Sequence, residues 1–132
     1  MAKSVLENAL KRGDVTVGDT VVEYTGGSTG SSLAFVSAAL GLKFVAVFSD
    51  AFSSNKQRTM EAFGATFHVE KSNGKGITPE LIQRMKTKAF ELSKKGNTFY
   101  ADQFGSTGVT LGFEPMGKEI CLLYTSDAAD DP

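Results

Sequence analysis

The chain has 132 residues, of which 41% are apolar, and its 14 Lys and Arg against 15 Asp and Glu leave a formal net charge of -1. This length allows one domain with a buried core, and no apolar run approaches the length of a membrane span. The basic residues are dispersed, so nucleic acid is not an expected partner. The N-terminus lacks the apolar stretch of a signal peptide, so we expect a cytoplasmic protein. A single cysteine, Cys121, excludes an internal disulfide and a cysteine-cluster metal site.

Apolar residues at helical spacing alternate along the chain with short apolar runs, which predicts helices alternating with strands. A continuous apolar run such as Phe44–Phe48 suits a strand buried on both faces. The alternation therefore predicts a three-layer αβα fold of the α/β class with a mostly parallel four-stranded sheet. In chain order we expect a helix over 2–11, a strand over 20–24, a helix over 31–40, a strand over 44–48, a helix from Ser53 or Ser54 to Gly64, a strand over 65–69, a helix from Thr78 to Gly96, a strand over 98–101 and a last helix from near Val109.

Two of these helices carry more specific expectations. In the helix that ends at Gly64, the apolar residues Met60, Ala62 and Phe63 are expected to face the core. In the last helix, Pro115 must occupy a first turn or cause a kink, because proline removes a backbone donor from a helix interior.

The six residues Thr25–Gly30 join the first predicted strand to the helix that follows it. A helix N-terminus presents unpaired backbone N–H groups and a partial positive charge, and glycines let a ligand approach that backbone closely. Ligands of parallel sheets bind beyond the carboxyl ends of the strands, where this junction lies and where Gln103 follows the fourth strand. The sequence therefore predicts an anion site at this junction.

A dinucleotide-binding loop, a P-loop and a purely structural turn are the other interpretations of this junction. A dinucleotide fingerprint needs glycines at the first, third and sixth positions, and counting from Gly26 places Ser28 and Ser31 where glycines belong. A P-loop is excluded because no Gly-Lys-Ser/Thr follows. A tight turn in which Ser28 or Thr29 only caps the helix stays open.

The segment Val21–Gly30 resembles the substrate-loop signature of fold type II pyridoxal-phosphate enzymes, the cysteine synthase and threonine dehydratase superfamily, in which a Glu-x-Thr-Ser-Gly-Asn-Thr-Gly pattern recurs. The similarity continues in the same order through Leu33–Ala39, Arg58–Ala65, Gln103-Phe104 and Gly117–Ile120. The resemblance thus covers nearly all of residues 1–120. It implies that this chain is the smaller, mobile domain of such an enzyme.

The resemblance also implies site residues. The α-carboxylate of a small amino-acid substrate would be held by the hydroxyls of Thr25 and Thr29, by backbone N–H groups of the loop that includes Gly26 and Gly27, and by Gln103. Gly26 stands where the family has serine. Ser28 stands where the family has an asparagine near the ring hydroxyl of the cofactor, pyridoxal 5'-phosphate, so its cofactor-binding role is an expectation.

Cysteine-synthase-like β-replacement is the implied activity, with serine or threonine dehydratase and a non-catalytic Rossmann-like anion-binding module as alternatives. The parent would be a transferase or lyase of amino-acid metabolism and a homodimer. Its Schiff-base lysine is expected before Met1 and its phosphate loop beyond Ile120, so no catalytic residue is expected in this chain, and 1–120 would be a domain truncated at both ends.

The sequence of the C-terminal segment indicates an origin different from that of the rest of the chain. The segment 121–132 resembles the conceptual translation of a transposase adapter used to prepare sequencing libraries. We therefore expect a non-native tail over these residues, with the natural segment ending near Ile120 inside a helix.

Overall fold

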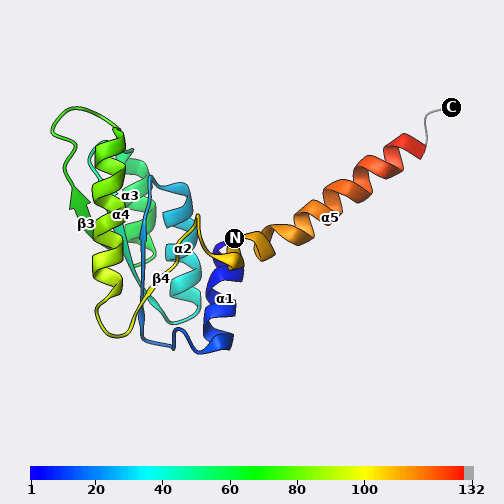
Figure 1. Ribbon diagram of the computed structural model, residues 1–132, viewed down its shortest axis with the longest axis horizontal. Coiled ribbons are helices and arrows are strands. Elements are labelled where there is room, and N and C mark those ends of the chain that lie inside the picture. Colours follow the sequence, from blue (N-terminus) through cyan, green and yellow to red (C-terminus); the bar gives the residue numbers. More distant parts are fainter. Residues whose placement is uncertain (130–132) are drawn as a thin grey trace.

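The computed structural model describes the backbone of residues 1–129 and the side chains of residues 1–124. Helices and strands alternate through the described chain, as Figure 1 shows. In order they are α1 (Ala2–Arg12), β1 (Thr20–Tyr24), α2 (Ser28–Ala39), β2 (Lys43–Ser49), α3 (Ser54–Ala62), β3 (Thr66–Glu70), α4 (Pro79–Ser93), β4 (Thr98–Tyr100) and α5 (Thr107–Ala129).

The four strands form one sheet in the order β3-β2-β1-β4, and every neighbouring pair is parallel. Val22 of β1 lies opposite Val45 of β2 and opposite Tyr100 of β4, so β1 is paired on both sides. The predicted α/β class and four-stranded sheet are confirmed, and the sheet is wholly parallel. Because the strands are parallel, the loops after β1 and β4 leave the sheet at the same edge.

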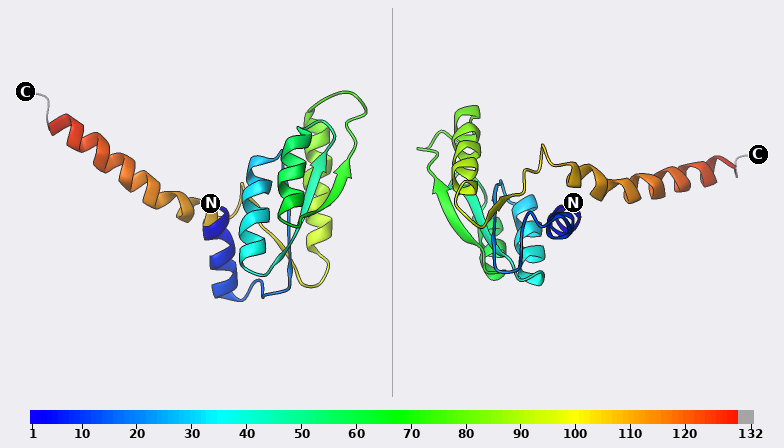
Figure 2. Two further views of the ribbon diagram at one scale, coloured as in Figure 1. Left: turned by 180° about the vertical axis from the view of Figure 1, so that it is seen from behind. Right: turned by 60° about the horizontal axis from the view of Figure 1, so that its bottom comes forward.

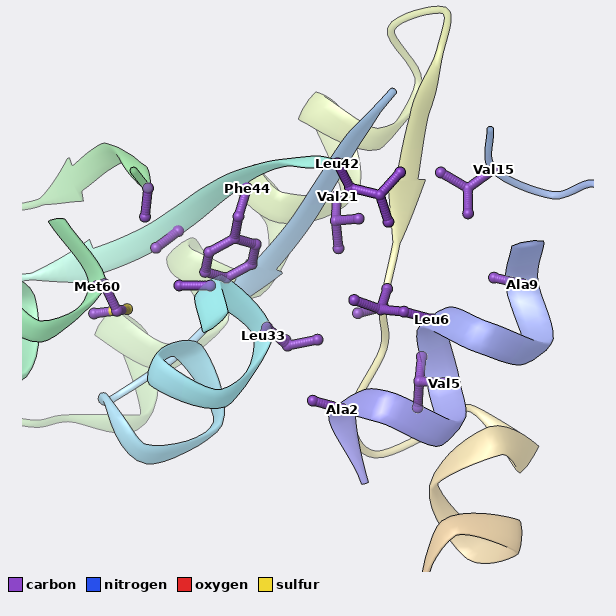
Figure 3. Close-up of a cluster of buried hydrophobic side chains, with 14 of the residues drawn as sticks. Ala2, Val5, Leu6, Ala9, Val15, Val21, Leu33, Leu42, Phe44 and Met60 are labelled. Carbon is purple, nitrogen blue, oxygen red and sulfur yellow. The ribbon is translucent and has the colours of Figure 1, made fainter. Parts of the chain in front are cut away.

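Helices cover both faces of the sheet. Helices α1, α2 and α3 pack over one face, where Leu6, Leu33, Val21, Phe44 and Met60 point into a common interior (Figure 3). Helix α4 covers the other face, as two further views show (Figure 2). Successive residues of a strand point to opposite faces of the sheet, so the apolar stripe of α4 packs on the strand side chains that point away from α1, α2 and α3. This second cluster consists of Val22, Tyr24, Val47, Leu81, Met85 and Ala89.

Most predicted boundaries lie within one or two residues of the observed ones, and β1 matches residue for residue. Helix α2 begins at Ser28, three residues before the expected start. The expected inward face of α3 is wrong in part: Met60 is buried, but Ala62 and Phe63 are exposed. Helix α3 turns only Met60 to the core, and the Phe63 ring packs on Phe35 of α2 with centroids 5.3 Å apart.

Helix α5 begins beside α1 and then leaves the body of the domain (Figures 1 and 2). Its first turns approach α1 closely, since a Cβ on Gly108 would lie 3.1 Å from the Cα of Val5. Farther along, the helix contains Pro115 in its interior and exposes the apolar side chains of Met116, Ile120, Leu122, Leu123 and Tyr124. The helix runs on through Ile120, and the expected tail beyond that residue stays a prediction; residues 130–132 lie outside the described part.

None of the helices described here combines the length and the apolar character needed to cross a membrane.

Candidate functional site

Thr25 organises the junction between β1 and α2. Its buried Oγ1 accepts hydrogen bonds from the backbone N–H groups of Gly27 and Gly30, both at 3.0 Å. A side chain just outside the helix thereby satisfies donors that the first helical turn leaves unpaired. This explains why α2 starts at Ser28: the capping oxygen comes from Thr25. The open alternative that Ser28 or Thr29 caps the helix is wrong, because within residues 1–129 neither hydroxyl accepts a backbone N–H.

Two glycines give the junction its shape. Gly27 has a φ of +138°, which L-amino-acid side chains rarely adopt, and a Cβ there would lie 2.6 Å from Cγ of Lys56. A Cβ on Gly30 would lie 2.5 Å from Sδ of Met60 and equally close to the methyl group of Thr25. The backbone can therefore turn tightly over the core only without side chains at these positions.

Three backbone donors remain at this junction. In the described chain, the N–H groups of Gly26, Ser28 and Thr29 donate to no protein acceptor, and the hydroxyls of Ser28 and Thr29 are also unpartnered. Gly26 and Ser28 are exposed, and Thr29 is half-buried. These donors lie at the positive end of a 12-residue helix, so they suit a small anion such as a carboxylate.

Glu23, two residues before Thr25, is fully buried and links this junction to the loop after β4. Its Oε1 accepts from the backbone N–H of Tyr24 at 3.0 Å, and its Oε2 accepts from that of Gln103 at 2.9 Å. Burial raises the pKa of the Glu23 carboxyl to about 7; the two N–H donors lower it, and the negative charge of Asp102 raises it further. A titratable carboxyl group thus lies in the core, hydrogen-bonded to two residues that line the candidate site.

Gln103 completes the link from the opposite direction. Its side-chain Nε2 donates to the carbonyl oxygen of Tyr24 at 3.1 Å, which leaves the second N–H of this amide available. The preceding residue, Asp102, has a φ of +47°, and its carbonyl oxygen accepts from Gly105 and Ser106. A tight turn therefore presents Gln103 to the end of β1.

A cavity of about 360 Å³ opens between the two loops. Its lining combines the stretch from Thr25 to Thr29 and Gln103, which carry the polar groups, with apolar side chains. The rings of Tyr24 and Phe104 lie 6.2 Å apart at one rim. The apolar side chains that line the cavity are Tyr24, Phe52, Ile82, Met85 and Phe104.

All six residues predicted for substrate or cofactor binding line this cavity: Thr25, Gly26, Gly27, Ser28, Thr29 and Gln103. The structure brings Gln103 to the loop across about 80 positions of sequence. It also explains the glycine at position 26, because a Cβ there would lie 2.9 Å from the Phe52 ring. A side chain at position 26 would require the Phe52 ring to shift.

Several residues at the cavity were not predicted from the sequence. Phe52, Ile82 and Met85 belong to other elements and look like ordinary core positions in their own segments. Glu23 did carry a signal: it is a charged residue inside the apolar run Thr20–Tyr24, which was expected to form a buried strand. A charge in such a strand requires internal hydrogen-bond partners.

The unpartnered donors of this cavity suit a small anion such as a carboxylate. No lysine lines the cavity among the residues that the structure describes, so these residues offer no amine for a covalent link to pyridoxal phosphate. No group of His, Cys, Asp and Glu in the described chain could hold a metal ion.

Residues 1–132 match the protein family described as "Pyridoxal-phosphate dependent enzyme". Among individual proteins, the O-ureido-L-serine synthase of Streptomyces lavendulae is 36% identical over 89 residues, which are 64% of this chain and 28% of that protein. The cysteine synthase of Staphylococcus aureus is 33% identical over 104 residues, 79% of this chain and 32% of that one. The chain spans about a third of the length of these relatives.

Solved structures agree with this assignment. A crystal structure of O-ureido-L-serine synthase superposes with a TM-score of 0.72 and 33% identity, covering 81% of this chain and 32% of that one. O-acetyl serine sulfhydrylase isoform 3 from Entamoeba histolytica gives a TM-score of 0.69 at 28% identity over 81% of this chain and 31% of that one. The family match, the related sequences and the superposed structures agree. This chain belongs to the family of pyridoxal-phosphate-dependent enzymes of fold type II, which includes the cysteine synthases.

Proposed function

We propose that this chain supplies the clamp for the substrate α-carboxylate in a pyridoxal-phosphate-dependent β-replacement enzyme that resembles cysteine synthase. The observation that carries the proposal is the set of unpartnered donors on one side of the cavity: the N–H groups of Gly26, Ser28 and Thr29, with the Thr29 hydroxyl and the second Nε2–H of Gln103 beside them. Charge-assisted hydrogen bonds from such donors are about twice as strong as neutral ones.

The apolar side of the cavity supports the same function. Phe52, Ile82 and Met85 keep water away from one face of the site, which strengthens hydrogen bonds on the other. Two named relatives are synthases of cysteine and of O-ureido-L-serine, both small amino acids that carry a heteroatom on the β carbon. The proposed substrate is therefore a small L-amino acid, fixed by its carboxylate so that its α and β carbons meet the cofactor.

Bound pyridoxal phosphate would supply an electron sink for the substrate's α carbon. The residues of this chain act on the other end of the substrate. The N–H groups and Thr29 bind the carboxylate, Gln103 orients it, and Ser28 would hold the ring hydroxyl of the cofactor. The mobile smaller domain would close the site over the bound substrate, which excludes water.

Amide resonances of the 132-residue chain, titrated with L-serine, test the clamp. We expect the largest shifts at Gly26, Ser28, Thr29 and the Gln103 side chain, and much smaller ones with L-serinamide, which lacks the carboxylate. Thr29→Ala should weaken L-serine binding about tenfold, because it removes a hydrogen bond to a charged group.

Ser53→Ala is the matched control, because Ser53 precedes a neighbouring helix and its side chain makes no capping hydrogen bond there. Its affinity for L-serine should equal that of the unmodified chain. Equal shifts at Ser54 and at Ser28, or equal binding of L-serinamide, would contradict a specific carboxylate clamp.

A further inference from the structure

Glu23 is an ionisable residue at a fully buried strand position, which is unusual. It lies in β1, one of the two inner strands of the sheet, on the same face as Val21, and none of its surface is exposed. Burying a carboxylate costs free energy unless its oxygens accept hydrogen bonds. The structure supplies one backbone donor for each oxygen: one belongs to Tyr24, the last residue of β1, and the other to Gln103 in the loop after β4.

These bonds form a closed link with the Gln103 side chain. Glu23 accepts from Tyr24 N–H at 3.0 Å and from Gln103 N–H at 2.9 Å, and Gln103 Nε2 donates back to the Tyr24 carbonyl at 3.1 Å. One carboxylate therefore fixes both the last residue of β1 and Gln103, which is hydrogen-bonded to that residue. A displacement of the loop after β4 would therefore reach the end of β1 through these bonds.

We propose that Glu23 is a positioning residue for the carboxylate clamp, holding Gln103 in register with the Thr25–Gly30 loop before a ligand enters. The inference rests on the proposed function, since it concerns the same site. Glu23 touches no ligand in this scheme and acts through Gln103 and Tyr24. Such preorganisation lowers the free-energy cost of ordering the site on binding.

A positioning role and a purely electrostatic role predict opposite effects of Glu23→Gln. A negative charge beneath an anion site repels a carboxylate, so its removal alone should tighten binding. The amide in Gln keeps one acceptor oxygen but turns an NH2 group toward an N–H donor, which breaks one of the two bonds. A positioning role therefore predicts weaker binding in spite of the lost repulsion.

Protonation provides a second route to the same test. The groups that act on Glu23 are the Asp102 carboxylate and the N–H donors of Tyr24 and Gln103, and its pKa lies near 7. The phenols of Tyr24 and Tyr100 lie within its electrostatic influence, but burial and neighbouring negative charge raise the pKa of both. A protonated Glu23 keeps one good acceptor only, so the link should loosen as the pH falls below about 7.

The experiment measures L-serine affinity of the 132-residue chain by amide titration for the unmodified chain, Glu23→Gln, Glu23→Asp and Asp102→Asn. We expect Glu23→Gln to bind about tenfold more weakly, by the loss of a hydrogen bond to a charged group. Glu23→Asp keeps the charge but is one methylene shorter, so it should weaken binding similarly. Unperturbed amide resonances in β2 and β3 verify that each variant is folded.

Asp102→Asn is the matched control. It removes a nearby negative charge, and asparagine tolerates the positive φ of this position and can still accept from Gly105 N–H. We expect its affinity to stay within about twofold of the unmodified chain, since the Glu23 link is intact.

The pH dependence separates positioning from general stability. In the unmodified chain, the amide resonances of Tyr24 and Gln103 should titrate together near pH 7, and L-serine affinity should decline with them towards lower pH. In Glu23→Gln this pH dependence should disappear. Equal or tighter binding by Glu23→Gln, or separate titration of the two amides, would overturn the positioning role alone; an unmodified chain that binds no L-serine would overturn the proposed function itself.

Discussion

Two strand-to-helix junctions lie side by side at the carboxyl ends of the sheet strands, and they differ in how their polar groups are hydrogen-bonded. The junction after β1 runs from Thr25 to Gly27, and the junction after β2 runs from Asp50 to Ser53. Both precede a helix N-terminus. Only the first lines the cavity along its whole length, whereas the second contributes Phe52.

The polar side chains of Ser49 and Asp50, at the start of the second junction, are hydrogen-bonded within the protein. Asp50 Oδ1 accepts from the Ser49 hydroxyl at 3.2 Å and from the backbone N–H of Ser72 at 2.7 Å, and the Ser49 hydroxyl accepts from Ala51 N–H. At the first junction, Thr25 Oγ1 accepts from the N–H groups of Gly27 and Gly30. The N–H groups of Gly26, Ser28 and Thr29 have no protein acceptor in the described chain. A helix N-terminus thus becomes a candidate site where small residues expose it and a second loop faces it.

The largest expected loss of stability and of ligand binding comes from Gly30→Ala, which would distort the first junction. The added Cβ meets Sδ of Met60 and the methyl group of Thr25 at 2.5 Å, so these side chains or the start of α2 must shift. We expect a loss of about 3 kcal/mol in the free energy of unfolding, measured by urea denaturation, and no detectable L-serine binding. Gly96→Ala, where a Cβ has nothing within 4 Å, is the control and should change stability by less than about 1 kcal/mol.

The two junctions should respond to pH with opposite signs. The pKa of Glu23 is raised from 4.5 to about 7 in the folded state, so its contribution to stability is full below pH 4.5 and declines as the pH rises to about 7. This decline amounts to about 3 kcal/mol, since one pKa unit corresponds to about 1.4 kcal/mol.

The pKa of Asp50 is lowered by its hydrogen bonds to Ser72, so its contribution is lost as the pH falls below its ordinary value of 3.8. Urea denaturation of Glu23→Gln between about pH 4 and pH 8 isolates the first effect. A decline of the same size in this variant would show that another group causes it.

A smaller effect is expected for Thr25→Val. The change keeps the shape of the side chain but removes the oxygen that accepts from Gly27 and Gly30. We expect a loss of about 2 kcal/mol in the free energy of unfolding from urea titration, because two N–H groups lose their acceptor. Thr25→Ser retains the oxygen and should lose less than half as much; equal losses would show that the methyl group, not the hydroxyl, stabilises the loop.

The smallest effect is expected at the second junction. Asp50→Asn weakens the contact with Ser72 N–H, so the amide resonance of Ser72 should shift. L-serine affinity should stay within about twofold, because Asp50 does not line the cavity. Weakening as large as that of Thr29→Ala would remove the distinction between the junctions.

Local patterns predicted most of the fold, because the strands are short apolar runs bounded by glycine or polar residues. Strand β1 and the capped start of α4 at Thr78 follow from such signals alone, and Thr78 does cap α4 through Leu81 N–H. The start of α2 was misplaced because its capping oxygen comes from Thr25, outside the helix. The inward face of α3 was wrong at Phe63 because only packing against α2 decides which side of a short helix is covered.

The candidate site was predictable to the extent that it is local. The stretch from Thr25 to Thr29 is contiguous, and Gln103 follows a predicted strand, so both could be named. Phe52 comes from the loop after β2, and Ile82 and Met85 come from α4; no spacing within those segments indicates a cavity. The partners of Glu23 depend on how β4 pairs with β1, which only the tertiary structure determines.

The link between Glu23 and Gln103 also has a kinetic consequence. It joins residues 80 positions apart, and closing so long a loop loses chain entropy before any contact compensates. Pairing of β1 with β2 spans a much shorter stretch, and in refolding we expect its amides to gain protection from hydrogen exchange first. Protection of the Gln103 amide, and with it the capacity to bind an amino acid, should arrive last, so ligand binding would report completion of the fold.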